Sequence, residues 1–537
     1  MNHEPEDVED TQHGTTHGSQ SDAGDCDEMM TVSPEAASST ACAPPGSLSR
    51  FMDCHMVTER DSLFRETPML RLLILCSITS CCLAADRPNI LFMMTDDQAP
   101  WATGVFEGET HADTPNLDRL FRSGTYLPNT FVVTPVCSPS RASLATSRYG
   151  SELGITDWIH PGREPKLGLN PKTTTWYEVV QQAGYHTGLV GKWHLGLTDA
   201  HHPTQTGFDY FMGHRGGGWS PKDPTLEKAG TQQKFKGLTT DILADHAIEF
   251  LTERPTDRPF LLVLHFRAPH ARWLPVAPAD WAPFESLKPK LPHPDYPGLD
   301  VGRVERMTRE YLASVRGVDR NVGRVLDALK RTGANDHTVI VFTSDHGYSM
   351  GHNGIWHKGN GHWVLKKEAL PKPTENIPRG QRPNMYDNSL RVPTAIRWPG
   401  VTTPGSTIRM SVTQLDWFPT MVAISGSKAP DGKIVRGRNL APLLQGASSN
   451  WQNNVFTQYS TKHQSRTHMR CYRTPEWKLV RDFLNPERDE LFHLKSDPDE
   501  LKNLIGEQQH ADTVRQLHKK IVQHMRQIED PALEFVK

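Results

Sequence analysis

The stretch Asn89-Ile-Leu-Phe-Met-Met94, followed directly by Thr95-Asp96-Asp97, decides the fold class of this chain. Its apolar run has the length of a buried strand, and the two carboxylates after it are residues of the kind that active sites use. Three more apolar runs, at residues 186–190, 260–266 and 338–343, also lead directly into acids, bases or cations. Ordinary polar loops would explain any one of these transitions, but four of them indicate strands whose C-terminal ends meet at one site.

The segments between these strands favour helices. Apolar residues recur at three- and four-residue spacing at 176–183, 242–254 and 311–329. The alternation of strands and helices predicts an α/β fold, with a mainly parallel sheet sandwiched by helices. Further along the chain the patterns become shorter, so we expect a catalytic domain over residues 86–444 and a smaller C-terminal α+β subdomain over residues 445–537.

Charge is distributed unevenly along the 537 residues. The whole chain carries 59 Lys and Arg against 62 Asp and Glu, but the first 85 residues hold 14 of the acidic side chains and only 4 of the basic ones. The remaining body therefore has a net charge of +7, which favours an anionic ligand. Its cations form no concentrated stripe and no nucleic-acid-binding module, so we expect no nucleic-acid partner.

The N-terminal segment is predicted to lie outside the fold. Residues 1–68 are acidic and poor in branched apolar side chains, which is typical of a disordered extension or of a mis-assigned translation start. Residues 69–85 combine a basic flank, an apolar run of about a dozen residues and small residues at the end, which is typical of a secretory signal peptide. Such a run is shorter than the span of about 20 residues that a membrane crossing needs. We therefore expect a periplasmic or secreted protein with no transmembrane segment in the mature chain; acylation at Cys81 or Cys82 and a buried helix or strand are the alternatives.

Cysteine usage singles out one residue. Six of the eight cysteines lie before residue 86, which leaves Cys137 and Cys471 in the body of the chain and excludes a disulfide framework there. Cys137-Ser-Pro-Ser-Arg141 places Pro139 where prolines favour the first turn of a helix. A thiolate at a helix N-terminus is stabilised by free amides and the positive end of the dipole. Cys137 is therefore a candidate nucleophile, with a buried structural cysteine as the alternative.

The same stretch resembles the C-x-P-x-R signature of type I sulfatases in the alkaline-phosphatase superfamily, which the formylglycine-generating enzyme reads in order to convert the cysteine. The resemblance extends over most of residues 86–505, in the order of the family's blocks. These blocks are Arg87-Pro-Asn-Ile-Leu91 with Asp96-Asp97-Gln98, Thr114-Pro-Asn-Leu-Asp118, Gly191-Lys-Trp-His-Leu-Gly196, Ser344-Asp-His-Gly347, Gly351-His-Asn-Gly-Ile-Trp-His-Lys358, Arg391-Val-Pro393 with Arg397-Trp-Pro-Gly400, and Glu490-Leu-Phe-His-Leu-Lys-Ser-Asp-Pro498.

The resemblance implies one bound Ca²⁺ per chain. Its protein ligands would be Asp96, Asp97, Asp345, His346 and the converted Cys137. Carboxylate oxygens suit a hard divalent cation. His346 stands where many relatives carry Asn, which leaves Mg²⁺ and Mn²⁺ open. Without Asp345 and His346 at another strand end, the two adjacent aspartates would be explained equally well as solvated turn acids.

The resemblance also implies a reaction at Cys137. Converted to formylglycine and hydrated, this residue would attack the sulfur of a sulfate ester through one hydroxyl, and loss of a proton from the other hydroxyl would then expel sulfate from the enzyme. If the converting enzyme is missing, Cys137 stays a thiol and the protein is nearly inert.

Five further residues have implied roles. Arg141 would orient the diol, and Lys192 and Lys358 would hold sulfate oxygens. His194 is the candidate base for the diol proton, and His270, aided by Lys358, is the candidate acid for the leaving alcohol. Any one of these side chains alone would more often be a surface or core residue.

Aromatic and cationic side chains near the motifs favour a sugar substrate. They lie at residues 214–219, 272–273 and 352–363, and such faces suit sugar rings that carry anionic groups. We therefore predict a sulfated poly- or oligosaccharide as the substrate. The alternatives are a phosphate or phosphonate ester hydrolase of the same superfamily and an inactive glycan-binding homologue.

Overall fold

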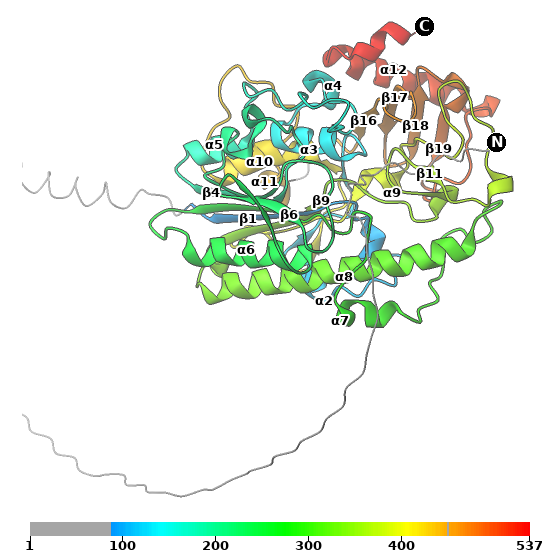
Figure 1. Cartoon of the computed structure of the whole chain (residues 1–537). Helices are drawn as coiled ribbons and strands as arrows, with labels where there is room; N and C mark the ends of the chain where they lie inside the picture. The colour runs from blue at the N-terminus through cyan, green and yellow to red at the C-terminus, as the bar shows by residue number, and fades with distance from the viewer. Residues whose placement is uncertain (1–86, 448–449, 537) are drawn as a thin grey trace, which may run out of the picture. The chain divides into compact units, whose positions relative to one another are not determined.

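The computed structural model describes residues 87–447 and 450–536 (Figure 1). The predicted acidic extension over residues 1–68 and the predicted signal peptide over residues 69–85 lie outside this part of the chain. Within the described part, none of the helices combines the length and the apolar composition that a membrane crossing requires.

The main sheet has ten strands, in the order β14-β2-β13-β9-β1-β8-β4-β5-β6-β7. Neighbouring strands from β9 to β5 all run parallel, which confirms the predicted mainly parallel sheet, while antiparallel strands flank this centre on both sides. The central strands are β1 (Asn89–Thr95), β4 (His186–Lys192), β5 (Tyr210–His214), β8 (Phe260–His265) and β9 (Thr338–Ser344). The flanking strands are β2 (Thr125–Tyr126), β6 (Thr225–Lys228), β7 (Thr231–Lys234), β13 (Ala395–Arg397) and β14 (Ser406–Thr407).

Helices cover both faces of this sheet (Figure 1). Side chains of β1 alternate between the two faces: Phe92 packs in one apolar cluster with Trp176 and Trp417, while Met93 packs in another with Val322. Burying each such side chain stabilises the fold by about 1.5–3 kcal/mol. The first face carries α3 (Cys137–Thr146), α5 (Trp176–Gln182) and α10 (Trp417–Ile424); the second carries α2 (Pro115–Ser123), α6 (Thr239–Glu253) and α8 (Val301–Arg331).

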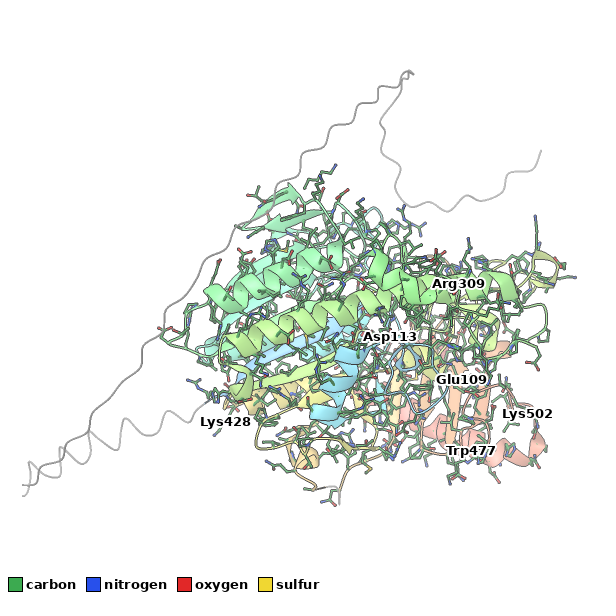
Figure 2. The ribbon with its side chains drawn as sticks, turned by 90° about the horizontal axis from the view of Figure 1, so that it is seen from below. Glu109, Asp113, Arg309, Lys428, Trp477 and Lys502 are labelled. Carbon is green, nitrogen blue, oxygen red and sulfur yellow. The ribbon has the colours of Figure 1, made fainter. Side chains whose placement is uncertain are left out.

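Helix α8 begins ten residues before the predicted start at residue 311. Its first turns are mainly polar, so the apolar periodicity used for the prediction is weak there. The helix begins after Asp300, which caps it: the Asp300 carboxylate accepts a hydrogen bond of 3.1 Å from the backbone N–H of Arg303. Figure 2 shows the face of the molecule on which α8 lies. Arg309 is labelled there, in the N-terminal part of α8 that precedes the predicted start.

The C-terminal part contains a four-stranded antiparallel sheet, as predicted for a smaller α+β subdomain. Its elements are β16 (Val455–Tyr459), β17 (Met469–Arg473), β18 (Trp477–Asp482), β19 (Glu490–His493) and α12 (Ala511–Gln527). The Lys478 ammonium group of β18 is fully buried, 2.8 Å from an Asp387 oxygen of α9 (Asp387–Leu390) and 2.6 Å from a Glu500 oxygen. This ion network ties the sheet to the part of the chain that precedes it. The domain boundary at residue 445 stays a prediction.

Candidate active site

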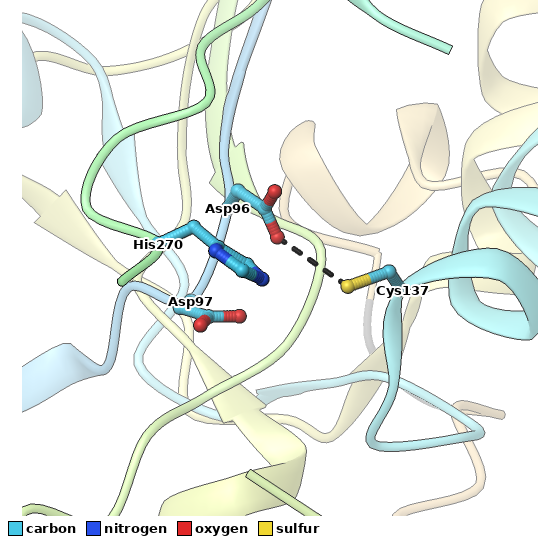
Figure 3. Close-up of side chains that lie close together, drawn as sticks. All are labelled: Asp96, Asp97, Cys137 and His270. Carbon is cyan, nitrogen blue, oxygen red and sulfur yellow. Dashed lines mark hydrogen bonds between the residues drawn. The ribbon is translucent and has the colours of Figure 1, made fainter. Parts of the chain in front are cut away.

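The C-terminal ends of four parallel strands meet at one site. Strands β1 and β9 pair in a register that sets Thr95 opposite Ser344, so the residues that follow them come together. The backbone N–H of Asp97 donates a hydrogen bond of 3.2 Å to Asp345. Lys192 ends β4, and His270 lies in the loop after β8. Figure 3 shows Asp96, Asp97 and His270 grouped together, with the Cys137 side chain pointing toward them from the opposite side.

Cys137 is the first residue of α3, and its side chain is 3% exposed. Its Sγ lies 3.5 Å from an Asp96 oxygen, 3.4 Å from His346 Nε2 and 3.2 Å from Lys358 Nζ (Figure 3 marks the first of these contacts). Burial and the Asp96 charge raise the pKa of the thiol, but the charges of Lys192 and Lys358 outweigh them and lower the pKa to about 6. The position therefore favours a negative charge, which suits a nucleophile.

The predicted metal ligands fall into two overlapping groups, one of which also includes His270, a residue predicted as an acid and not as a ligand. One contains Asp96, Asp97, Cys137 and His270, the other Asp96, Cys137, Asp345 and His346; in each group the ligand atoms lie within 4.8 Å of one another. Asp97 Oδ2 is buried and has no hydrogen-bond partner among the described residues. Burial raises the pKa of Asp97 to about 7, although the Lys358 charge opposes this. An unpartnered buried carboxylate oxygen beside further oxygen donors fits a hard cation.

Three buried cationic side chains form ion pairs with the acidic side chains of the site. Both Arg141 Nε and Arg141 Nη2 lie 2.9 Å from the same oxygen of Asp345, and Lys192 forms an ion pair with Asp96. Lys358 donates a hydrogen bond of 2.7 Å to Asp97. Each of these three residues is at most 3% exposed. Such buried charges are stable only as a paired set, and together they offer an anion several donors at once.

The two predicted acid-base histidines differ in position. His270 belongs to the ligand cluster, and its Nδ1 lies 2.6 Å from the Ala271 carbonyl, which leaves Nε2 as the acceptor. His194 Nε2 lies 3.2 Å from the Ile159 carbonyl, while its buried Nδ1 has no hydrogen-bond partner among the described residues. No hydrogen bond in the described part joins His194 to Cys137. Burial holds the pKa of both histidines well below the usual range, so both are neutral near pH 7.

His265 is a site residue that the sequence analysis missed. It is buried at the end of β8, and its Nδ1 lies 3.0 Å from the Lys192 carbonyl oxygen. Arg141 Nη1 donates a bond of 3.1 Å to the same oxygen. His265 thus fixes the backbone around which two of the cations are arranged. The signal in the sequence is a polar residue inside the apolar run at residues 260–266.

A family model described as Sulfatase matches residues 88–427. The chain belongs to the sulfatase family. A second model, described as N-sulphoglucosamine sulphohydrolase, C-terminal, matches residues 381–527 of this sulfatase. The predicted family and fold are therefore confirmed, and so is the predicted enzyme class: the protein hydrolyses sulfate esters.

Known proteins resemble this sulfatase over most of its length. An N-acetylglucosamine-6-O-sulfatase of Bacteroides thetaiotaomicron is 27% identical over 530 residues, which cover 83% of this chain and 87% of the relative. A structure solved in complex with its substrate, D-glucosamine-2-N,6-O-disulfate, has a TM-score of 0.71 and 26% identity, and covers 83% of this chain and 99% of that chain. A phosphonate monoester hydrolase from Silicibacter pomeroyi has a TM-score of 0.61 at 22% identity, covering 83% of this chain and 96% of that chain, a likeness that shows the fold alone.

Proposed function

We propose that this sulfatase releases inorganic sulfate from sulfated poly- or oligosaccharides, with Cys137 converted to formylglycine and one Ca²⁺ held beside it. The observation that carries the proposal is the buried cluster around Cys137 Sγ, where Asp96, His346 and Lys358 all lie within 3.5 Å. The saccharide class is supported by the relatives, because one is named for a sulfated amino sugar and one was solved with a sulfated glucosamine.

The cation would be held by Asp96, Asp97, Asp345 and His346 together with the residue at position 137. The donor set is mainly carboxylate oxygen, which Ca²⁺ prefers, and the free Asp97 Oδ2 is a ligand atom still in need of a partner. When bound, Ca²⁺ acts as a Lewis acid that offsets negative charge on the sulfate group. Burial lowers the pKa of His346, but the charges of Asp345 and Asp97 raise it to about 9 overall, so ligation requires this histidine to lose its proton.

The remaining side chains orient the ester and move protons. Formylglycine at position 137 supplies, as its hydrate, the hydroxyl that attacks sulfur. Lys192 and Lys358 offer N–H donors to the sulfate oxygens, in a buried site where such bonds are strong, and Arg141 orients the hydrate and offsets negative charge. His270 lies on the side of Asp96 and Asp97, and the negative charge of a bound sulfate ester favours its protonation at Nε2. The protonated side chain gives this proton to the departing alcohol, and the charge of Lys358, which keeps its own proton, makes His270 a stronger acid. His194, with its unpartnered Nδ1, takes the proton of the hydrate.

Maturation and location complete the proposal. The motif at Cys137 needs a formylglycine-generating enzyme as a partner during maturation. The predicted signal peptide at residues 69–85 would send the chain to the periplasm or out of the cell, where sulfated polysaccharides are found.

The test separates this proposal from its two rivals. Protein made together with a formylglycine-generating enzyme is given calcium and a panel of sulfated saccharides, beginning with N-acetylglucosamine 6-sulfate, alongside 4-nitrophenyl sulfate and a phenylphosphonate ester. We expect sulfate release from a saccharide and at least about 100-fold less from Cys137→Ala. Faster turnover of the phosphonate would favour the ester-hydrolase rival. Glycan binding without sulfate release, retained in Cys137→Ala, would favour the inactive homologue.

A further inference from the structure

The side chain of Lys358 reaches the nucleophile from a hairpin turn. Lys358 lies between β10 (Ile355–Trp356) and β11 (His362–Trp363), and its ammonium group contacts both Cys137 Sγ and Asp97. Each of the two strands is 2 residues long, and the ladder between them does not include Lys358. Contacts from outside the hairpin must therefore help to hold its backbone in place.

One such contact comes from Asn384. Asn384 Nδ2 donates a hydrogen bond of 3.0 Å to the Lys358 carbonyl oxygen, and the Asn384 backbone N–H donates one of 2.8 Å to the Gly359 carbonyl oxygen. The Gly359 N–H in turn donates a bond of 2.9 Å to the carbonyl oxygen of Pro135, two residues before Cys137. A Cβ at Gly359 would lie 2.4 Å from the Pro135 ring, so only glycine allows this close approach. The turn that carries Lys358 is thus held between Asn384 and the segment that leads to the nucleophile.

The surroundings of Asn384 call for an amide side chain. Asn384 is 0% exposed, and its Nδ2 lies within 3.4 Å of three backbone carbonyl oxygens. Its Oδ1 accepts hydrogen bonds of 3.2 Å from the Tyr386 N–H and 2.9 Å from the Ser389 hydroxyl. An amide supplies donors at one end and an acceptor at the other, so both ends of this side chain match their partners.

The segment around Asn384 is anchored to the C-terminal sheet. Arg382 and Tyr386, two residues before and two residues after Asn384, bond to the same carboxylate oxygen of Glu490, the first residue of β19. Arg382 Nη2 lies 2.5 Å from this oxygen, and the Tyr386 hydroxyl donates a hydrogen bond of 3.2 Å to it. The two anchors restrict the backbone on both sides of Asn384, which makes the amide a fixed support for the turn of Lys358.

We propose that Asn384 is a positioning residue, which fixes the backbone of Lys358 so that the ammonium group reaches Cys137 and Asp97. The inference rests on the role proposed for Lys358 and extends it, because Asn384 acts through Lys358 alone. Misplacing a catalytic group by about 1 Å can lower a rate about 100-fold. Loss of the Asn384 amide should therefore lower kcat, although the reacting groups themselves are unchanged.

A double-mutant cycle tests whether Asn384 acts through Lys358. The value of kcat for 4-nitrophenyl sulfate is measured in wild-type protein, Asn384→Ala, Lys358→Ala and the double variant, with matched conversion of Cys137. We expect Asn384→Ala to lower kcat at least about tenfold when Lys358 is present. In the Lys358→Ala background the same change should cost less than about threefold, because the effects of coupled residues do not add.

Two further variants separate positioning from a general loss of stability. Asn384→Ser carries its hydroxyl one bond closer to the backbone than the amide nitrogen, so it should show the same coupling with a smaller loss of kcat. Asn321 of α8 is also 0% exposed and donates a hydrogen bond of 2.9 Å to the Gly317 carbonyl oxygen. As the matched control, Asn321→Ala should lower Tm and keep kcat within about threefold of wild type.

Three outcomes would overturn the positioning role. The losses of Asn384→Ala and Lys358→Ala could multiply in the double variant, which would show that Asn384 acts independently of Lys358. Asn384→Ala and Asn384→Ser could both keep the wild-type kcat. Asn321→Ala could lower kcat as much as Asn384→Ala at a similar Tm, which would show an effect of stability alone. Failure of the proposed role of Lys358 is recognised separately, because then Lys358→Ala itself leaves kcat unchanged, and the inference about Asn384 fails with it.

Discussion

The ammonium group of Lys358 lies 3.2 Å from Cys137 Sγ and 2.7 Å from an Asp97 oxygen, and all three side chains are buried. One cation therefore bridges the nucleophile position and the acidic cluster. Because burial opposes its charge but the charges of Asp97 and Cys137 outweigh this, the pKa of Lys358 is raised, so the side chain stays charged at every working pH.

Removing the Lys358 ammonium group should lower kcat more than it weakens substrate binding. Replacing Lys358 by Ala is expected to lower kcat for 4-nitrophenyl sulfate about 100- to 1,000-fold, as is typical when one donor to a developing anion is lost. Lys358→Arg keeps the charge but changes the donor geometry, and should lose less. Steady-state kinetics with matched conversion of Cys137 measures both. A kcat within threefold of wild type in Lys358→Ala would contradict the role.

Metal binding should raise the thermal stability of the protein. A cation that binds the folded state alone stabilises it by about 2.7 kcal/mol at a hundredfold excess over Kd. We expect Tm to rise when Ca²⁺ is added after chelation, and sulfate release to return with it. Asp97→Asn should abolish the rise in Tm, whereas Asp295→Asn, an exposed residue elsewhere, should keep it. An equal rise in both variants would rule out the assigned site.

Of the two cysteines in the part of the chain that the structure describes, one should be reactive and one inert in unconverted protein. The pKa of Cys137 is lowered to about 6 because Lys192 and Lys358 outweigh burial and Asp96, while burial raises the pKa of Cys471 to about 12. The thiolate is the reactive form, so alkylation of Cys137 in metal-free protein should rise with pH up to about 6 and then level off. Cys471 should stay unlabelled at neutral pH. Iodoacetamide labelling followed by peptide mapping measures both sites, and preferential labelling of Cys471 would contradict these directions.

His265 is expected to act through its Nδ1 position. The amide of Asn can present an N–H near the place of Nδ1, whereas Gln presents it one bond further out. His265→Asn should therefore keep kcat within a few-fold of wild type, and His265→Gln should lose at least about tenfold, because the Lys192 carbonyl loses a donor. Equal losses in the two variants, compared by kinetics and by Tm, would show that only packing matters.

The buried ion pairs of Lys478 should make the main contribution to the stability of the contact between the C-terminal sheet and the part of the chain that precedes it. Lys478→Met leaves the Glu500 carboxylate without its cation and the Asp387 carboxylate with Arg473 alone, and breaking a buried pair in this way costs about 3–5 kcal/mol. Urea denaturation gives the change in the free energy of unfolding. Lys495→Met removes an exposed lysine from a surface pair and should change little. A similarly small effect in Lys478→Met would contradict the importance of the network.

Local patterns predicted the elements that place the candidate catalytic cluster around Cys137. An apolar run followed by polar residues located the ends of β1, β4, β8 and β9, because a parallel sheet brings such ends together wherever its strands lie in the sequence. The start of α8 was missed because its first turns are polar and depend on a single capping residue, Asp300. The strand ends, which have a strong local sequence pattern, were therefore predicted, whereas the start of α8, which has a weak pattern, was not.

Other features depend on contacts that no local pattern contains. Residues near 158, 381 and 465 come together around one small cavity, and their proximity depends on how three loops pack. His265 could not be recognised as a positioning residue because its partner is a backbone carbonyl on a neighbouring strand. The metal ligands were proposed from the family resemblance, and the structure adds that their donor atoms lie within 4.8 Å of one another in each group.

The most direct measurement is tandem mass spectrometry of the peptide that contains residue 137, on protein that releases sulfate. The account predicts an aldehyde in place of the thiol, in a fraction that rises and falls with the specific activity across preparations made with and without the converting enzyme. Full activity in a preparation whose residue 137 is entirely unmodified cysteine would contradict it.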